Sequence, residues 1–459
     1  MSLPQLLGCA SIDPITLRAD QGKLQDLTLA TTRPGFSGAG YAAGFKNSTG
    51  EIEWTFEAPH PGIYDLQIRY SASGAKGYEL ILNDVGYDGT LPASPRDFSE
   101  HNAGKVEIAQ GKNVLKLGRG WGNYDIDSIK LVPSGPLAPP KAVAAKLADP
   151  LATPAACALM ERLAQNYGRG TFTGVIKDAD RKHVESVTGM TPMVMGGDLM
   201  EYSPSRREHG SNPRNETERL IAAAAAGHIV TYLWHWNAPT DLINQRNFVT
   251  KSGKRVDASW YRGFYTEATT FDFAAALDQP DSPAYALLIR DIDVIAAELK
   301  KLDAAGVPVL WRPLHESDGK WFWWGARGPD NLKRLWRLLH DRLTNHHQLH
   351  NLIWVYTWND HDWYPGDDVV DMIGMDAYPK RANDPLIGKW ADALRHFDGK
   401  KMIALTEIGG TADVPRMRRL GAHWSFFASW TGAQGPQKTP EADLRRIYQS
   451  PDVLNLGGR

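Results

Sequence analysis

The chain has 459 residues, of which 42% are hydrophobic and 23% charged, so its composition is that of a globular protein and excludes wholesale disorder. A formal net charge of −2 gives no reason to expect a nucleic acid or an anionic membrane as partner. Two cysteines, Cys9 and Cys157, are too few for a disulfide scaffold, a four-cysteine zinc site or an iron–sulfur cluster. No run approaches the roughly 18 apolar residues of a membrane span, so we expect no spanning segment.

The N-terminus allows two interpretations. Residues 1–7 lack the basic region and the apolar stretch of a signal peptide. Residues 6–10, Leu-Leu-Gly-Cys-Ala, resemble the end of a bacterial lipoprotein signal, in which Cys9 would carry the lipid. The alternative is a short unstructured tail.

Residues 13–132 have the pattern of an antiparallel β-sandwich. Short segments alternate apolar and polar side chains, as in residues 51–56 and 64–70, and turn-forming residues separate them. Residues 133–152 begin with Pro-Ser-Gly-Pro-Leu-Ala-Pro-Pro, which predicts a stiff linker.

From residue 153 to 459, apolar runs alternate with helical patterns. Residues 288–302 repeat apolar side chains at three- and four-residue spacing before Gly306, and the Ala-rich segment 214–226 ends at Gly227. The eight predicted strands are residues 171–175, 192–195, 229–233, 307–310, 352–356, 372–375, 402–405 and 424–428. Eight such units indicate a (β/α)8 TIM barrel. A doubly wound open sheet would favour a glycine-rich phosphate loop, which the sequence lacks. We therefore expect an α/β protein, a TIM barrel preceded by an all-β jelly-roll sandwich.

Two glutamates follow predicted barrel strands, where active groups of such barrels are found. Glu316 closes the fourth strand and Glu407 the seventh. Hydrolysis of a glycosidic bond requires one protonated and one ionised carboxyl group. Arg312 could keep one carboxylate charged, while apolar neighbours raise the pKa of the other. The alternative is a pair of structural glutamates bound to arginines inside the barrel.

Aromatic residues crowd the same strand ends. They include Trp358, Trp430 and the pair Trp234 and Trp236, and the chain holds 16 Trp and 16 Tyr in total. Indole rings cover the C–H faces of sugar rings, although any single Trp is as easily a core residue. Other chemistries fit less well, because the sequence has no H-E-x-x-H zinc motif and no G-x-S-x-G nucleophile elbow.

Three segments of the barrel region resemble glycoside hydrolase family 26, the β-mannanases. They are residues 311–316 (Trp-Arg-Pro-Leu-His-Glu) with 319–325 (Gly-Lys-Trp-Phe-Trp-Trp-Gly), residues 371–378 (Asp-Met-Ile-Gly-Met-Asp-Ala-Tyr) and residues 405–409 (Leu-Thr-Glu-Ile-Gly). The resemblance implies a retaining enzyme with Glu316 as general acid/base and Glu407 as nucleophile. It also implies that Tyr378 orients the nucleophile. The other residues expected to contact sugar are His235, His315, Trp321, Asp376 and Trp430. For His235 an alternative is that the flanking Trp234 and Trp236 bind instead.

Residues 13–132 resemble carbohydrate-binding module family 35. Residues 35–41 (Gly-Phe-Ser-Gly-Ala-Gly-Tyr), 61–64 (Pro-Gly-Ile-Tyr) and 125–129 (Asp-Ile-Asp-Ser-Ile) are among the matching pieces. The resemblance implies sugar binding by the loop before the last strand, with Trp121, Asn123 and Asp125, although Trp121 could instead be a core residue. It also implies a structural calcium near Asp20 and Asp127, which Arg18 disfavours because it brings a cation beside the metal.

Together these features predict a monomeric endo-β-1,4-mannanase that needs no cofactor for catalysis and acts on mannan, glucomannan or galactomannan. Such a protein is expected to be extracellular or in the cell envelope or periplasm. Two alternatives stay open: the same mechanism on β-1,3-xylan or mixed-linkage β-glucan, and a non-catalytic glycan receptor.

Overall fold

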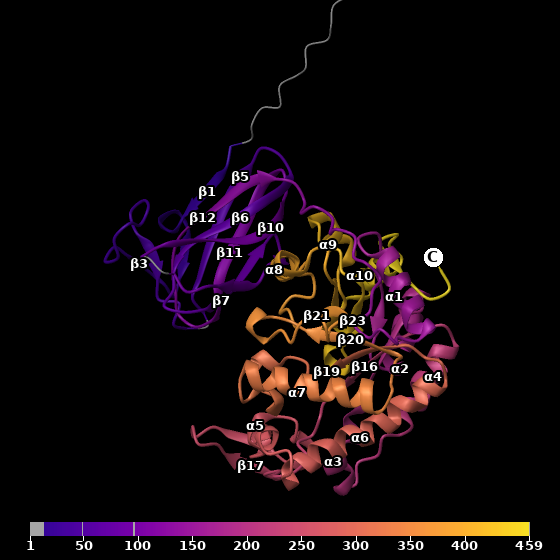
Figure 1. Cartoon of the computed structure of the whole chain (residues 1–459). Coiled ribbons are helices and arrows are strands. Elements are labelled where there is room, and N and C mark those ends of the chain that lie inside the picture. Colours follow the sequence, from indigo (N-terminus) through magenta and orange to yellow (C-terminus); the bar gives the residue numbers. More distant parts are fainter. Residues whose placement is uncertain (1–12, 48, 95–96, 459) are drawn as a thin grey trace, which may run out of the picture. The chain divides into compact units, whose positions relative to one another are not determined.

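The computed structural model describes residues 13–47, 49–94 and 97–458, and Cys9 therefore lies outside the described residues (Figure 1). The chain divides into two compact units. Unit 1 contains the described chain up to Pro139 together with the segments Pro379–Asp392 and Pro415–Ala422, and unit 2 contains the rest.

The N-terminal part of unit 1 consists of two antiparallel sheets. One has the order β10-β6-β12-β4-β3 with β1 added beside β12, and the other has the order β2-β5-β11-β7-β8 with β9 added beside β7. The strands are β1 (Ile15–Arg18), β2 (Lys23–Gln25), β3 (Thr28–Ala30), β4 (Tyr41–Ala43), β5 (Glu51–Ala58), β6 (Gly62–Ser71), β7 (Lys76–Leu82), β8 (Val85–Gly86), β9 (Gly89–Leu91), β10 (Ser99–Ile108), β11 (Gly111–Trp121) and β12 (Asp125–Ser134).

The alternation in the sequence predicts the core of this sandwich correctly. In β5, Ile52, Trp54 and Phe56 are buried, while Glu51 and Glu53 lie nearer the surface. Successive side chains of a strand point to opposite faces, so this period of two places one face of each sheet in the core.

Unit 2 is built on a closed barrel of eight parallel strands, which confirms the predicted (β/α)8 fold. In order around the barrel these are β14 (Gly174–Val175), β15 (Val194–Asp198), β16 (Ile229–Trp234), β19 (Val309–Pro313), β20 (Leu352–Thr357), β21 (Met372–Ala377), β22 (Met402–Ile408) and β23 (Phe427–Ser429). The remaining strands are β13 (Thr171–Phe172), which pairs with β24 (Val453–Leu454), and the hairpin of β17 (Gln245–Val249) and β18 (Arg255–Ala258).

Helices alternate with the barrel strands. In Figure 1 the strands lie together inside helices such as α2, α4, α6 and α7. The α-helices are α1 (Pro154–Asn166), α2 (Asp178–Thr188), α3 (Pro204–Glu208), α4 (Glu216–Ala225), α5 (Phe273–Asp278), α6 (Pro283–Ala304), α7 (Pro329–Asp341), α8 (Ile387–Phe397), α9 (Val414–Leu420) and α10 (Glu441–Tyr448). No helix in the described ranges is both long enough and apolar enough to cross a bilayer.

Several predicted strands differ from the observed ones at their ends; the second and fourth begin two residues and end three residues later than predicted. The first splits after Phe172, because Thr171 and Phe172 pair with β24 and only Gly174 and Val175 enter the barrel. The eighth begins at Phe427 rather than at residue 424. The Ser425 N–H donates to the carbonyl of Ile403 in β22 at 2.8 Å, and the Ser425 carbonyl accepts the N–H of Phe172 at 3.0 Å, so the stretch before Phe427 bonds both to the barrel and to the strand that pairs with β24. Hydrophobic runs therefore located these strands but not their hydrogen-bond partners.

Candidate active site

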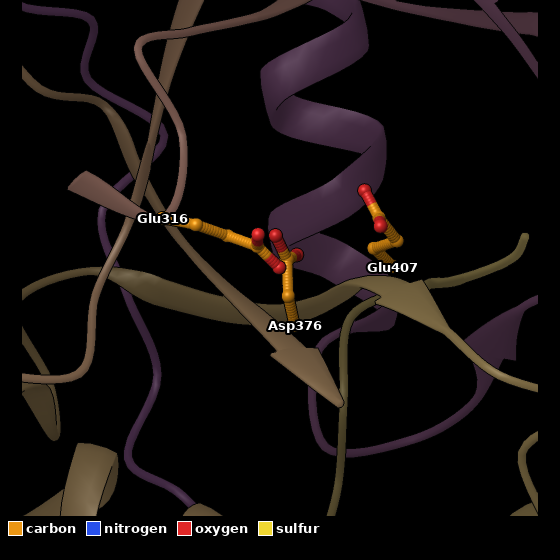
Figure 2. Close-up of side chains that lie close together, drawn as sticks. All are labelled: Glu316, Asp376 and Glu407. Atoms are coloured by element: carbon orange, nitrogen blue, oxygen red, sulfur yellow. The ribbon is translucent and has the colours of Figure 1, made fainter. Parts of the chain in front are cut away.

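Three acidic side chains converge at the carboxyl-terminal end of the barrel. Asp376 lies in β21 and Glu407 in β22, while Glu316 lies three residues beyond the end of β19. One carboxyl oxygen from each residue lies within 4.8 Å of an oxygen of each of the others. Figure 2 shows the Asp376 carboxyl between those of Glu316 and Glu407 in this view. The two glutamates expected from strand-end positions are therefore brought together, with Asp376 as a third acid.

A buried arginine holds two of these acids. The Arg312 guanidinium donates to Asp376 Oδ2 at 2.7 Å and to Glu407 Oε2 at 2.5 Å, and its side chain is only 1% exposed. The Tyr378 hydroxyl donates to the other oxygen of Glu407, and Thr406 Oγ1 donates to Asp376 Oδ1 at 2.7 Å. A buried ion pair is stable only when its remaining hydrogen-bonding capacity is filled, and these contacts meet that condition.

Glu316 has a different environment. Burial raises its pKa to about 8, and the negative charges of Asp376 and Glu407 add to the effect. Trp321 Nε1–H donates to Glu316 Oε2 at 3.0 Å, whereas the Arg312 guanidinium donates to Asp376 and Glu407. Burial also raises the pKa of Asp376, to about 6. The site thus contains a carboxyl that stays protonated near neutral pH beside one that is bound to a cation.

Two histidines lie next to these acids. His315 Nε2 and His235 Nε2 are 3.2 Å apart, and His235 Nδ1 lies 2.7 Å from Asp198 Oδ2. Burial lowers the pKa of His315 well below its usual range, and the nearby charges of Arg312 and His235 contribute. The His235 ring also contacts the rings of Phe264 at 5.0 Å and Trp430 at 6.0 Å between centroids. The two predicted histidines therefore contact each other, and His235 contacts Asp198.

The tryptophans divide into exposed and core groups. Trp321 is 47% exposed, and Tyr378 is 44% exposed. Trp234 and Trp236, the alternatives to His235, are fully buried and stack on each other with centroids 4.2 Å apart. Trp358 is only 4% exposed and packs against Phe397. Aromatic residues do gather at the strand ends, but about half of them are buried and pack beneath the site.

Sequence reasoning missed Asp198 as a member of the site. Asp198 ends β15 in the segment Gly-Gly-Asp, so its strand-end position was the signal that could have identified it. The left-handed backbone conformation of Leu314 and Glu316 could not be predicted from the sequence either, because neither residue type normally adopts it.

The three acids are also the one set of His, Cys, Asp and Glu side chains, among the described residues, close enough to share a metal ion. Arg312 already supplies a positive charge to two of them. Proton transfer and nucleophilic attack by these carboxyl groups need only the side chains themselves.

In the sandwich, the predicted sugar-binding residues lie on the loop between β11 and β12 and at its ends. Trp121 is 52% exposed and Asn123 is exposed. Asp125 is partly buried and accepts a hydrogen bond from Arg33 Nη2 at 3.0 Å. Trp121 is therefore not a core residue.

The expected calcium ligands do not fit a calcium ion. Asp127 is fully buried and its oxygens accept from the Ser37 amide at 2.6 Å and from Arg69 Nη1 at 2.5 Å. Asp20 accepts from Arg18 Nε at 3.1 Å and from the Ala39 amide at 2.9 Å. Each carboxylate already has a guanidinium beside it, whereas calcium requires several free oxygen ligands.

Comparison with known proteins identifies the family. The sequence pattern of glycosyl hydrolase family 26 matches residues 148–458. The chain belongs to glycosyl hydrolase family 26. The pattern of carbohydrate binding module family 35 matches residues 15–134, so this family 26 enzyme also contains a module of that kind.

Curated and solved relatives of this family 26 chain match along most of its length. A mannan endo-1,4-beta-mannosidase of Thermothelomyces thermophilus is 40% identical, covering 97% of this chain and 90% of that protein. Mannan endo-1,4-beta-mannosidase A of a Piromyces species is 32% identical, covering 95% and 71%. The crystal structure of the GH26-CBM35 beta-(1,4)-mannanase of Podospora anserina is 40% identical, covers 96% of this chain and 98% of its own, and has a TM-score of 0.67. The family, the enzyme class and the fold predicted from the motifs are therefore confirmed.

Proposed function

We propose that this chain is a retaining endo-β-1,4-mannanase that uses Glu316 as general acid/base and Glu407 as nucleophile. The observation that carries the proposal is the 4.8 Å limit on the separation of their carboxyl oxygens. Retaining glycosidases place these groups about 5–5.5 Å apart, whereas inverting enzymes need about 6.5–9.5 Å to hold a water between them.

In the first step, a Glu407 oxygen attacks the anomeric carbon and Glu316 gives its proton to the leaving glycosidic oxygen. The bond from carbon to the leaving oxygen breaks, and the sugar becomes an ester of Glu407. The pKa of Glu316, raised to about 8, keeps the acid protonated at neutral pH. Arg312 and Tyr378 each bind one oxygen of Glu407 and so fix the direction of attack.

In the second step, Glu316 takes a proton from a water molecule as that water attacks the anomeric carbon. The ester bond to Glu407 breaks, and Glu316 regains its proton. Each step inverts the carbon once, so the product keeps the configuration of the substrate.

The relatives named as mannan endo-1,4-β-mannosidases support mannan, glucomannan or galactomannan as substrate. The exposed Trp321 offers an apolar face for a sugar ring, and Trp430 lies partly exposed beside His235. His235, His315 and Asp376 provide polar atoms for its hydroxyls. The family 35 module would bind glycan through Trp121, Asn123 and Asp125 and raise the local concentration of polymer.

We propose further that the enzyme works as a monomer outside the cytoplasm. All the acids of the site come from one chain, and a polysaccharide is too large to enter a cell. Light scattering of the purified protein tests the first statement, and fractionation of the producing cells tests the second.

The decisive experiment is product analysis with two variants. Glu316→Ala and Glu407→Ala should each lose at least about 10³-fold in kcat on mannohexaose, and Glu441→Ala, an exposed glutamate paired with Arg445, should not. With an aryl mannoside whose leaving group departs without a proton, azide should restore Glu316→Ala with a β-linked product and Glu407→Ala with an α-linked product. Near-normal activity of either variant, or no products from the unaltered enzyme, would refute the proposal; faster cleavage of β-1,3-xylan or barley glucan than of mannan would refute its substrate.

A further inference from the structure

The acid/base segment lies on a strained turn. Leu314 and Glu316 both have left-handed backbone conformations, with φ of 49° and 52°, and neither is glycine. Such conformations cost free energy and persist only where surrounding contacts hold them. His315 lies between the two residues, so its contacts help to hold the turn, together with the Gly319 N–H that donates to the Glu316 carbonyl at 3.2 Å.

His315 is attached at two points. Its carbonyl accepts a hydrogen bond from Trp324 Nε1 at 2.9 Å, and its Nε2 lies 3.2 Å from His235 Nε2. Since both partners in the second contact are imidazole nitrogens, one proton must lie between them. Which ring carries that proton decides the direction of the hydrogen bond, and with it whether His315 Nδ1 is bare or carries hydrogen.

The contacts of Asp198 determine which nitrogen of His235 carries hydrogen. Its Oδ1 accepts the backbone N–H of Met200 at 2.9 Å and that of His235 at 3.1 Å, and its Oδ2 lies 2.7 Å from His235 Nδ1. Burial tends to raise the pKa of Asp198, but the His235 contacts outweigh it and the net pKa is lowered. The group is therefore an ionised acceptor, and His235 Nδ1 must carry hydrogen.

The rest of the chain of hydrogen bonds follows from this. With hydrogen on Nδ1, a neutral His235 has a bare Nε2, which accepts the hydrogen of His315 Nε2. His315 Nδ1 is then bare, and this atom is buried with no hydrogen-bond partner. An unpaired buried acceptor occurs more readily than an unpaired buried N–H, so this arrangement is the better one.

We propose that Asp198 is a positioning residue for the acid/base. Through His235 it fixes the hydrogen of His315 on Nε2, and this hydrogen bond holds the strained turn that presents Glu316. The inference rests on the proposed role of Glu316. The contacts from Asp198 through His235 to His315 connect the ends of three successive barrel strands, β15, β16 and β19.

Asp198→Asn tests the chain with almost no change in shape. The two backbone N–H groups keep the amide oxygen at the Oδ1 position, so the amide NH2 faces His235 Nδ1. His235 must then carry hydrogen on Nε2, and His315 on Nδ1. We expect kcat on mannohexaose to fall about 10–100-fold, with a smaller change in KM, because His315 Nδ1–H would then be buried without an acceptor and would shift the turn that presents the acid.

The readout that separates positioning from general damage is 15N NMR of histidine-labelled protein, assigned with single His→Gln variants. The unaltered protein should show hydrogen on His235 Nδ1 and His315 Nε2, and Asp198→Asn should show the reverse. Asp291→Asn is the matched control, since Asp291 is fully buried and accepts from Trp236 Nε1 at 2.9 Å without a contact to either histidine. It should leave both tautomers unchanged.

The proposal is overturned if the unaltered protein carries hydrogen on His315 Nδ1, if Asp198→Asn keeps the original tautomers, or if the tautomers exchange while kcat stays normal. The first measurement needs no variant of Asp198, so it decides even where Asp198→Asn does not fold. It is also independent of the azide experiment, so failure of the assigned glutamate roles and failure of the histidine chain give different results.

Discussion

Glu316 and Glu407 have carboxyl oxygens within 4.8 Å of each other, yet Arg312 donates to Glu407 and not to Glu316. Two neighbouring carboxyl groups of the same chemical type therefore have different surroundings. The one beside the guanidinium accepts its hydrogen bond, and the other is buried near the charges of Asp376 and Glu407. This asymmetry is what the proposed acid and nucleophile roles require at a single pH.

The pKa of Glu316 predicts the alkaline limit of activity. Since burial raises this pKa to about 8 and the first step needs the protonated acid, kcat/KM should fall as the pH rises through about 8. Trp321→Phe removes the N–H that stabilises the ionised form, so its limit should move to higher pH. A pH–rate profile of both proteins measures this, and an unchanged or lower limit in the variant would contradict it.

Glu316 should also make stability depend on pH. Its folded pKa is raised above the ordinary value, so its contribution to the free energy of unfolding is fully present below about pH 4.5 and is lost as the pH rises to about 8. Glu316→Gln cannot ionise and should exceed the unaltered protein in stability at pH 9. Urea unfolding at pH 5 and pH 9 tests this, and an equal difference at both values would exclude it.

Arg312 should be needed for folding as well as for activity. Its replacement by Met leaves the carboxyls of Asp376 and Glu407 buried without their cation, which costs about 3–5 kcal/mol in comparable pairs. We expect a large loss of stability and a loss of kcat beyond about 100-fold. Arg446→Met, which breaks a less buried pair with Asp413, is the control and should retain kcat. Denaturant unfolding and initial rates provide the two measurements.

Tyr378 should matter for rate but little for stability. Its side chain is 44% exposed, and its hydroxyl donates to Glu407. Tyr378→Phe should therefore lower kcat by about 10–100-fold, since the nucleophile loses one of its two oriented partners. Its melting temperature should stay near that of the unaltered enzyme, and a change confined to KM would argue against an orienting role.

The exposed and buried tryptophans should behave oppositely. Trp358→Ala removes a side chain that is 4% exposed, so we expect about 3–5 kcal/mol of destabilisation. Trp121→Ala removes one that is 52% exposed, and should weaken binding of the protein to insoluble mannan while hydrolysis of mannohexaose continues at the normal rate. Pull-down with mannan and thermal unfolding distinguish the two, and a destabilised Trp121→Ala would contradict the assignment.

The pattern of apolar and polar residues in the sequence predicted more of the fold than of the site. Eight apolar runs located all eight barrel strands, because burial of a parallel strand on both faces leaves a continuous hydrophobic segment in the sequence. The same runs misplaced the ends of several strands by a few residues, and at the first strand Thr171 and Phe172 pair with β24 instead of entering the barrel.

Within the site, local sequence identified Glu316 and Glu407, because side chains that follow barrel strands face one opening whatever the loops do. The alternation of Trp234, His235 and Trp236 carried no such information. Only the packed structure shows that the histidine reaches His315 and Asp198 while both tryptophans are core.

The amino-acid sequence by itself determined the strands, the family motifs and the two glutamates at strand ends, since each depends on neighbours in the chain. Tertiary structure alone decided which carboxyl pairs with Arg312, that Asp376 joins them, and that Asp198 reaches His315 through His235. These relations join residues up to 117 positions apart, from Asp198 to His315, and the closing of the barrel sets them through distances and burial that no local pattern records.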